Sequence, residues 1–102
     1  MKVHLVQTNP PLPVDEYVEI NHFPFVVGRS SGCDFRIFHP MVSRHHCELK
    51  RSNEGVLIED LHSSNGTYVN GHPIREGEVL RDGDEINLGC LSYRVTFSPS
   101  AN

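Results

Sequence analysis

The sequence predicts an all-β protein built as a sandwich or barrel of short strands. Glycine and proline, with eight and seven copies, divide the whole chain into short segments. The segments between them are rich in β-branched and aromatic residues, whereas helical periodicity is nearly absent. The result is roughly ten short strands with turn signals about every 8–12 residues, a spacing typical of β-sandwiches and barrels.

In the first half of the chain, the strands are predicted from alternation or from short apolar runs. Residues 2–7 and 16–21 alternate apolar and polar side chains, as a strand with one buried face does. The segment between them, 8–14, is predicted as a loop because its three prolines cannot join a strand ladder. Residues 23–29 are apolar as far as Gly28 and are predicted as a buried strand. The remaining elements of this half are a turn at 30–34, a strand at 35–38 and a loop at 39–43.

In the second half, turn sequences separate the strands. The predicted strands are 45–51, 56–61, 67–70, 77–80 and one each within 81–89 and 91–98. We expect a hairpin turn at 52–55 and a tight Asn-Gly turn at 70–73. The loop at 62–66 ends in Gly66, which is suited to a positive φ.

Composition indicates one soluble domain. The 102 residues suffice for a single core, and 37% apolar with 22% charged residues is typical of globular proteins. No apolar run approaches the length of a membrane span, and the N-terminus lacks the apolar stretch of a signal peptide. We therefore expect a cytoplasmic protein without a membrane partner, or a nuclear one if the source is eukaryotic.

The charge balance argues against nucleic acid as a partner. Nine basic and thirteen acidic side chains give a net charge of −4, whereas nucleic-acid binding usually requires a basic face. A small anion site remains compatible with this balance, because two arginines dominate the field over a few ångströms. The three cysteines, Cys33, Cys47 and Cys90, form no C-x-x-C pair, and we expect them to be buried free thiols.

The segment 42–49, VSRHHCEL, admits three chemical interpretations. Ser43 and His46 suggest a nucleophile and base, but no G-x-S-x-G elbow, orienting group or oxyanion hole is evident. His45, His46 and Cys47 suggest a metal site. On a strand, however, adjacent ligands face opposite sides, whereas zinc requires four convergent ligands. The third interpretation is an anion-binding loop formed by Ser43 and Arg44.

The anion interpretation gains support from residues elsewhere in the chain. Phosphate accepts several charge-assisted hydrogen bonds. Arg29 supplies a planar fork of donors, Ser64 a second hydroxyl, and Asn65 an amide that can pair with a peptide backbone. Taken singly, each of these residues is more simply explained as an ordinary surface or turn residue. Chain order alone does not show that their loops meet.

The combination of motifs is more specific than its parts. GRSSGCD, VSRHHCEL and LHSSNGTYVNG resemble the forkhead-associated (FHA) domain family. That family shows Gly-Arg, then Ser-x-x-His, then two Asn-Gly pairs at similar intervals. The matching residues here are Gly28-Arg29, Ser43 to His46, Asn65-Gly66 and Asn70-Gly71. The segment LRDGDEINLG also resembles the closing hairpin of the family, so that the resemblance runs from about Val3 to Phe97.

The resemblance implies an eleven-stranded, two-sheet β-sandwich, like those of FHA and SMAD domains, with binding loops at one end. It implies a domain over residues 1–98 and a disordered tail at 99–102. It also implies phosphothreonine-dependent peptide binding. The implied phosphopeptide-binding residues are Arg29, Ser43, Arg44 and Ser64 on the phosphate and Asn65 on the peptide backbone. The residues implied to shape the loops are Gly28, His46, Gly66 and Asn70, with His46 as the brace between them.

The expected partner is a protein phosphorylated by a Ser/Thr kinase in signal transduction. We expect a monomer with no catalysis, cofactor or metal. The alternative is a phosphate-independent interaction domain that uses a sheet face or loops. In the family that the chain resembles, the loop before the serine motif often reads the residue three places after the phosphothreonine. Because Met41 lies in this loop, which is apolar here, we expect an aliphatic residue at that peptide position. Thr8, in the predicted loop near the N-terminus, is a candidate phosphosite recognised by the domain itself.

Overall fold

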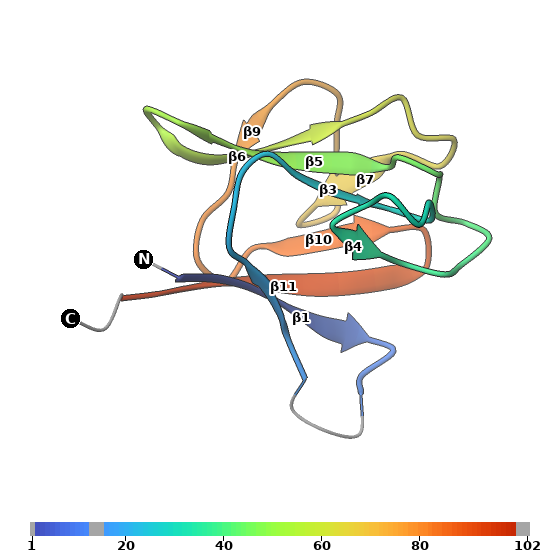
Figure 1. The fold of residues 1–102 in the computed structure, drawn as a ribbon, viewed down its shortest axis with the longest axis horizontal. Helices are drawn as coiled ribbons and strands as arrows, with labels where there is room; N and C mark the ends of the chain where they lie inside the picture. The colour runs from blue at the N-terminus through green and yellow to red at the C-terminus, as the bar shows by residue number, and fades with distance from the viewer. Residues whose placement is uncertain (1, 13–15, 100–102) are drawn as a thin grey trace.

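The computed structural model describes residues 2–12 and 16–99, which contain eleven strands and no helix. The strands form two sheets packed face to face (Figure 1). In spatial order, the six-stranded sheet consists of β2 (Val18–Ile20), β1 (Lys2–Asn9), β11 (Leu91–Ser98), β10 (Glu85–Leu88), β7 (Thr67–Val69) and β8 (His72–Ile74). The five-stranded sheet consists of β4 (Phe35–Arg36), β3 (Phe25–Gly28), β5 (Cys47–Ser52), β6 (Gly55–Asp60) and β9 (Glu78–Val79). The predicted all-β, eleven-stranded sandwich is confirmed.

The core lies between the inner faces of the two sheets. Strand alternation puts Val3 and Leu5 of β1 into it, and Tyr93 and Val95 of β11 beside them. The five-stranded sheet contributes its own buried residues, among them Leu49, Val56 and Ile58. Each such side chain contributes roughly 1.5–3 kcal/mol on burial, so this interface holds the sandwich together. Within the described ranges, no helix exists that could cross a bilayer.

Strand register brings the three informative loops to one end of the molecule. Val27 near the end of β3 pairs with Cys47 at the start of β5, and Cys47 also pairs with Asp60 at the end of β6. The loops after β3, before β5 and after β6 therefore start from strand ends on the same side of the five-stranded sheet. They lie together at the right of Figure 1. The meeting of loops that chain order left open is thus a consequence of antiparallel pairing.

Two strand predictions were wrong in detail. His72 and Pro73 were predicted to belong to the turn at 70–73 but are part of β8, because Asn70 (φ 51°) and Gly71 (φ 83°) complete a two-residue hairpin turn by themselves. Pro73 is tolerated in β8 because this strand is the edge of its sheet. In addition, Thr8 and Asn9 belong to β1 rather than to a loop. The end of the predicted proline loop, at residues 13 and 14, and most of the predicted tail, at residues 100–102, lie outside the described part.

Candidate functional site

The loops that follow β3 and precede β5 are joined through their backbones. The amide of Arg29 donates to the carbonyl of Ser43 at 2.9 Å, and that of Ser30 to the carbonyl of Arg44 at 3.0 Å. This approach is so close that a Cβ atom on Gly28 would overlap the Arg44 carbonyl oxygen. Glycine is therefore required at position 28 by its neighbours rather than by its φ.

His46 connects the serine loop to the Asn-Gly loop. Its side chain is fully buried, at 0% exposure. Ring atom Nδ1 accepts a hydrogen bond from the amide of Ser43 at 3.0 Å, and Nε2 lies 2.8 Å from the carbonyl oxygen of Gly66. Because Nδ1 accepts, the proton must be on Nε2, which donates to Gly66. One neutral imidazole thus satisfies one backbone group in each loop.

These contacts bear on the two disfavoured interpretations of the same segment. Both ring nitrogens of His46 are engaged by backbone groups, so neither is free to deprotonate Ser43 or to ligate a metal. His45 is exposed whereas Cys47 is buried, so these two side chains do not converge on one point. Burial raises the pKa of the Cys47 thiol well above its ordinary value, which keeps it protonated.

The hydroxyl group of Ser43 is fixed by one hydrogen bond that it accepts, and its own proton remains available. Its hydroxyl oxygen accepts from the backbone amide of Ser64 at 2.9 Å. A hydroxyl that accepts in this way keeps its own proton free to donate outward. The hydroxyl of Ser64 belongs to an exposed residue and lies on the same junction of loops. The structure therefore brings these two serines together.

The guanidinium group of Arg29 is likewise held through only one of its nitrogen atoms. Its Nε atom donates to the carbonyl of Val42 at 2.9 Å, which fixes the guanidinium plane and leaves the terminal amino groups for a ligand. Arg29 and the exposed Arg44 line a shallow depression of about 350 Å³. The site thus contains two cations and two hydroxyls within one group of loops.

Asn65 also supports a loop of the site. Its amide nitrogen donates to the carbonyl oxygen of Met41 at 2.8 Å, which ties the Asn-Gly loop to the loop before Ser43. Among described residues, the amide oxygen has no hydrogen-bond partner and can accept from a peptide amide. Met41 packs its Cβ against Gly89 and remains 39% exposed, so it can contact a ligand.

The Asn-Gly loop is held by a carboxylate that sequence reasoning missed. Asp60 at the end of β6 accepts from the hydroxyl and amide of Ser63 and, at 2.7 Å, from the hydroxyl of the buried Thr67. Burial alone would raise the pKa of Asp60, but the hydrogen bonds from Ser63 and Thr67 outweigh it and lower this pKa. The Asp-x-x-Ser spacing is typical of such a turn and could have indicated it. Gly66 then closes the loop with a φ of 84°.

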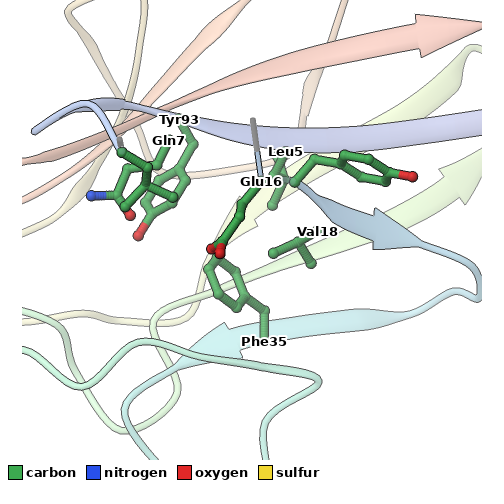
Figure 2. A pocket seen from close by; sticks show the side chains of 8 residues that line it. Leu5, Gln7, Glu16, Val18, Phe35 and Tyr93 are labelled. Atoms are coloured by element: carbon green, nitrogen blue, oxygen red, sulfur yellow. The ribbon is translucent and has the colours of Figure 1, made fainter. Parts of the chain in front are cut away.

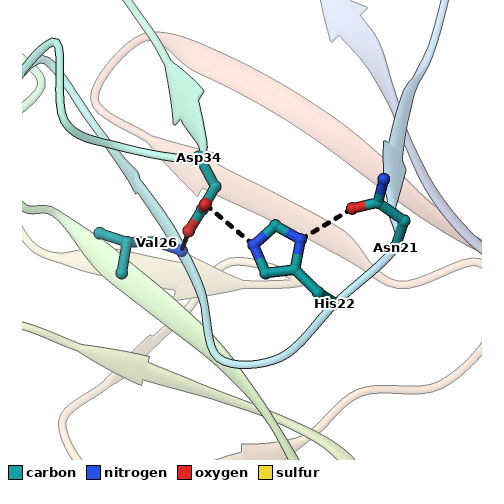
Figure 3. A network of polar contacts seen from close by, with 4 residues as sticks. All are labelled: Asn21, His22, Val26 and Asp34. Atoms are coloured by element: carbon teal, nitrogen blue, oxygen red, sulfur yellow. Dashed lines mark hydrogen bonds and ion pairs between the residues drawn. The ribbon is translucent and has the colours of Figure 1, made fainter.

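A second carboxylate anchors the loop between β3 and β4 (Figure 3). Asp34 accepts from the amide of Val26 at 2.8 Å and faces the His22 ring at 2.9 Å. The other ring nitrogen of His22 lies 2.8 Å from the side-chain oxygen of Asn21. The Val26 amide is the main cause of the lowered pKa of Asp34, with a further contribution from His22. This contact fixes the end of the loop that begins with Arg29.

Arg36 and Phe38 also line the depression, although no sequence motif selected them. The Nε atom of Arg36 donates to the carbonyl oxygen of Arg29 at 2.9 Å. The guanidinium carbon lies 4.4 Å from the centre of the Phe38 ring, which is 80% exposed. The depression therefore holds three arginines rather than two. In the sequence, this pair could have been noticed only as an arginine and an aromatic residue two positions apart, a few residues after the Gly-Arg motif.

Three sequence-based expectations need correction. Asn70 does not support the binding loops: it follows the opposite end of β7, where its side chain bonds Asp84 at 3.0 Å and the amide of Glu85 at 2.9 Å. Thr8 is not in a loop, and its hydroxyl donates to the Glu85 carboxylate at 3.4 Å. Cys90 is exposed rather than buried, because it lies in the turn between β10 and β11.

An apolar hollow of about 240 Å³ lies elsewhere, where the edge strands β2 and β4 approach (Figure 2). Leu5, Val18 and Phe35 line it, and the ring of Phe35 meets the ring of Tyr93 edge-on at 5.6 Å between centres. Burial raises the pKa of Tyr93 to about 12. This hollow shares none of the residues of the basic depression.

The fold and the loops define a β-sandwich domain that carries basic and hydroxyl side chains at one end. The chain belongs to the FHA domain family, whose family model matches residues 25–89. FHA domains are binding modules that recognise phosphothreonine peptides.

Named relatives agree with this assignment. The chain is 40% identical over 70 residues to the oxoglutarate dehydrogenase inhibitor of Corynebacterium diphtheriae, an alignment that covers 69% of this chain and 47% of the relative. It is 42% identical over 64 residues to the FHA domain-containing protein FhaA of Mycobacterium tuberculosis, covering 63% of this chain and 12% of FhaA. The alignments therefore span less than half of these relatives' own lengths.

A solved FHA domain superimposes over nearly the whole chain. It comes from a structural and functional study of phosphothreonine-dependent FHA domain interactions. The TM-score is 0.85 at 30% sequence identity, and the match covers 98% of this chain and 100% of the other. The similarity thus extends beyond the region matched by the family model and includes the first and last strands.

Proposed function

We propose that this chain is a phosphothreonine-dependent peptide-binding module without catalysis of its own. Arg29, Ser43, Arg44 and Ser64 hold the phosphate, and Asn65 binds the peptide backbone beside it. The observation that carries this proposal is the one-sided anchoring of Arg29 and Ser43. Each uses one polar atom to bond the loop backbone and keeps its other donors for a ligand.

The charge of the ligand fits these donors. A phosphothreonine carries about −1.5 to −2 charges at neutral pH and three acceptor oxygens. Two guanidinium groups and two hydroxyls match it without a metal ion, since each charge-assisted hydrogen bond contributes about 1.5–3 kcal/mol. Because the depression is shallow and exposed, we expect modest affinity, on the order of micromolar. The preference of Met41 for an aliphatic residue, the monomeric state and the cytoplasmic location stay predictions.

Calorimetry with one peptide in phosphorylated and unphosphorylated forms tests the proposal. We expect binding only of the phosphorylated form, and a loss of about 10–100-fold in affinity on Arg29→Ala, because one or two charge-assisted bonds disappear. Arg51→Ala is the matched control, since Arg51 is exposed within β5, near the end of that strand opposite to the binding loops. Equal affinity of wild type and Arg29→Ala for the phosphopeptide would refute the site.

A second candidate function, phosphate-independent protein binding, is favoured by the apolar hollow between β2 and β4. Tyr17 and Leu12 at its rim are exposed at 59% and 39%. A partner that binds there would be insensitive to Arg29→Ala and to dephosphorylation. It would lose affinity on Tyr17→Ala, which separates the two candidates.

A further inference from the structure

The depression at the binding end contains more positive charge than one phosphate requires. Arg29, Arg36 and Arg44 all line it. The ion pairs within residues 2–12 and 16–99 involve His22 and Lys50, so no described carboxylate lies within 4.0 Å of these three guanidinium groups. A phosphothreonine of about −2 is matched by two arginines, which leaves the charge of the third without a counterpart. Such a concentration of cations is unusual in a chain with a net charge of −4.

Arg36 is held in a defined orientation. Its Nε atom donates to the Arg29 carbonyl at 2.9 Å, and its guanidinium carbon lies over the Phe38 ring, 4.4 Å from the ring centre. Both contacts leave the terminal amino groups unused. Fixing an arginine in this way lowers the conformational entropy lost when it binds a ligand. The contact also gives a reason for keeping a phenylalanine that is 80% exposed.

The position of Arg36 also separates it from the part of the site expected to read the peptide backbone. The depression is lined by Arg29, Ser30, Arg36, Phe38 and Arg44. Asn65 and Met41, which are joined by their own hydrogen bond, are not among these residues. We therefore expect a group bound by Arg36 to occupy a different peptide position from a group in contact with Met41.

We propose that Arg36, stacked on Phe38, forms a second anion subsite that binds an acidic group of the same peptide, next to the phosphothreonine. The acidic group is either a carboxylate of Asp or Glu or a second phosphate. This inference rests on the proposed function, because the phosphothreonine brings the acidic group within reach. It adds to that function a sequence requirement that the Gly-Arg, Ser and Asn-Gly motifs do not contain.

The test uses a phosphothreonine peptide with alanine at the flanking positions. One set of variants moves a single aspartate through the three positions on either side, and a second set places another phosphothreonine at the same positions. Affinities are measured by fluorescence anisotropy for wild type, Arg36→Gln and the control Arg51→Gln. The control is closely matched, because Arg51, near the other end of β5, is an exposed arginine whose guanidinium carbon lies 5.1 Å from the centre of the Phe23 ring.

We expect aspartate at one or two adjacent positions to tighten wild-type binding about 2–5-fold, the upper part of the range for one exposed ion pair. A second phosphate there should tighten it further, which distinguishes the two sources of the acidic group. Arg36→Gln should abolish the gain, which is measured for each variant as the ratio of its affinity for the aspartate peptide to its affinity for the alanine peptide. Arg51→Gln should keep the gain.

Several results would overturn the inference. If no acidic position improves binding of wild type, or if Arg36→Gln weakens all phosphopeptides equally, Arg36 acts on the phosphothreonine or on Arg29 and forms no second subsite. A nitrogen-detected NMR titration of wild type needs no variant. The Arg36 Nε–H signal should shift further with the acidic peptide than with the alanine peptide, and equal shifts would contradict the subsite. Failure of every phosphopeptide to bind wild type would instead overturn the proposed function itself.

Discussion

At the scale of single residues, buried or crowded positions prepare the site for residues that stay exposed. His46 is completely buried and contacts only backbone groups through its ring nitrogens, yet it fixes the loop that carries Ser43. Gly28 leaves room for the Arg44 carbonyl, and so allows the two basic loops to run side by side. Exposed donors such as Arg29 and Ser43 are then held by their neighbours before a ligand arrives, which lowers the cost of binding.

Replacing Gly28 should therefore disturb the site directly. Gly28→Ala would place a Cβ against the Arg44 carbonyl and 3.0 Å from the Cys33 sulfur, which forces the loops apart. We expect a loss of about 1–3 kcal/mol in the free energy of unfolding, measured by urea denaturation, together with weaker phosphopeptide binding. Gly32→Ala in the same loop is the control, because its Cβ would meet nothing closer than 3.9 Å. Equal stability of the two variants would contradict this explanation.

Replacing His46 should affect both loops at once. His46→Ala leaves the Ser43 amide and the Gly66 carbonyl without their buried partner. We expect the free energy of unfolding to fall by about 2–4 kcal/mol, since each unsatisfied buried group costs about 1–3 kcal/mol. His45→Ala, one residue earlier and exposed, should leave stability nearly unchanged in the same denaturation experiment. A His45 effect as large as that of His46 would show that the brace is not specific.

At the scale of elements, the strand ends determine where each loop starts, and carboxylates hold the loops there. Asp60 at the end of β6 and Asp34 before β4 both accept backbone and side-chain hydrogen bonds in their ionised forms. These bonds lower the pKa of both carboxyls. The two carboxylates thereby tie the binding loops to the ends of the strands. A rigid sheet that positions loops in this way is a common basis for a binding site.

This arrangement makes stability depend on pH in a defined direction. Because the folded-state pKa of Asp60 lies below its unfolded value of about 3.9, its contribution is complete above pH ~4 and is lost as the pH falls through the folded-state pKa. Asp60→Asn should lower the free energy of unfolding by about 1–2 kcal/mol at pH 7, and the difference from wild type should shrink below pH ~4. Denaturation at several pH values measures this, and Glu76→Gln, exposed in the loop after β8, is the control. A difference that persists unchanged in acid would argue against the ionised carboxylate as the cause.

At the scale of the whole molecule, the two ends of the chain complete one sheet. β1 and β11 pair antiparallel from Lys2 with Ser98 onward. Both strands lie outside the 25–89 region matched by the family model, yet they supply core residues of the six-stranded sheet. The region that identifies the family is therefore shorter than the region that forms the complete sandwich.

A chain limited to residues 25–89 should not fold, although it contains all the proposed phosphate-binding residues. β10 would lose its partner β11, and the core would lose Val3, Leu5, Tyr93 and Val95. We expect no cooperative thermal transition by circular dichroism and no phosphopeptide binding. A chain of residues 1–99, which retains all eleven strands, is the control and should behave as the full chain does. Cooperative unfolding of the short chain would show that β1 and β11 are dispensable.

The fold class and most of the strands were predictable from the residues alone, because alternation, prolines and Asn-Gly or Asp-Gly turns act over a few residues. The family was also predictable, because Gly28-Arg29, the Ser43-to-His46 motif and Asn65-Gly66 keep their spacing along the chain. Thr8 and β8 were misplaced where local turn signals competed with pairing to a neighbouring strand, since such pairing is invisible within a short window.

Which side chains meet at the site became clear only from the packing of the strands and loops in three dimensions. Antiparallel register brings three separate loops to the same end of the five-stranded sheet. Asn70 lies at the other end of β7 and bonds Asp84. Asp60 holds the Asn-Gly loop through Thr67. The packing of the loops also adds Arg36 and Phe38 to the depression beside Arg29, although no motif includes them. The physical reason is the same in each case. These contacts depend on which strands pair and on how the loops pack at the strand ends, and a short stretch of sequence does not contain this information.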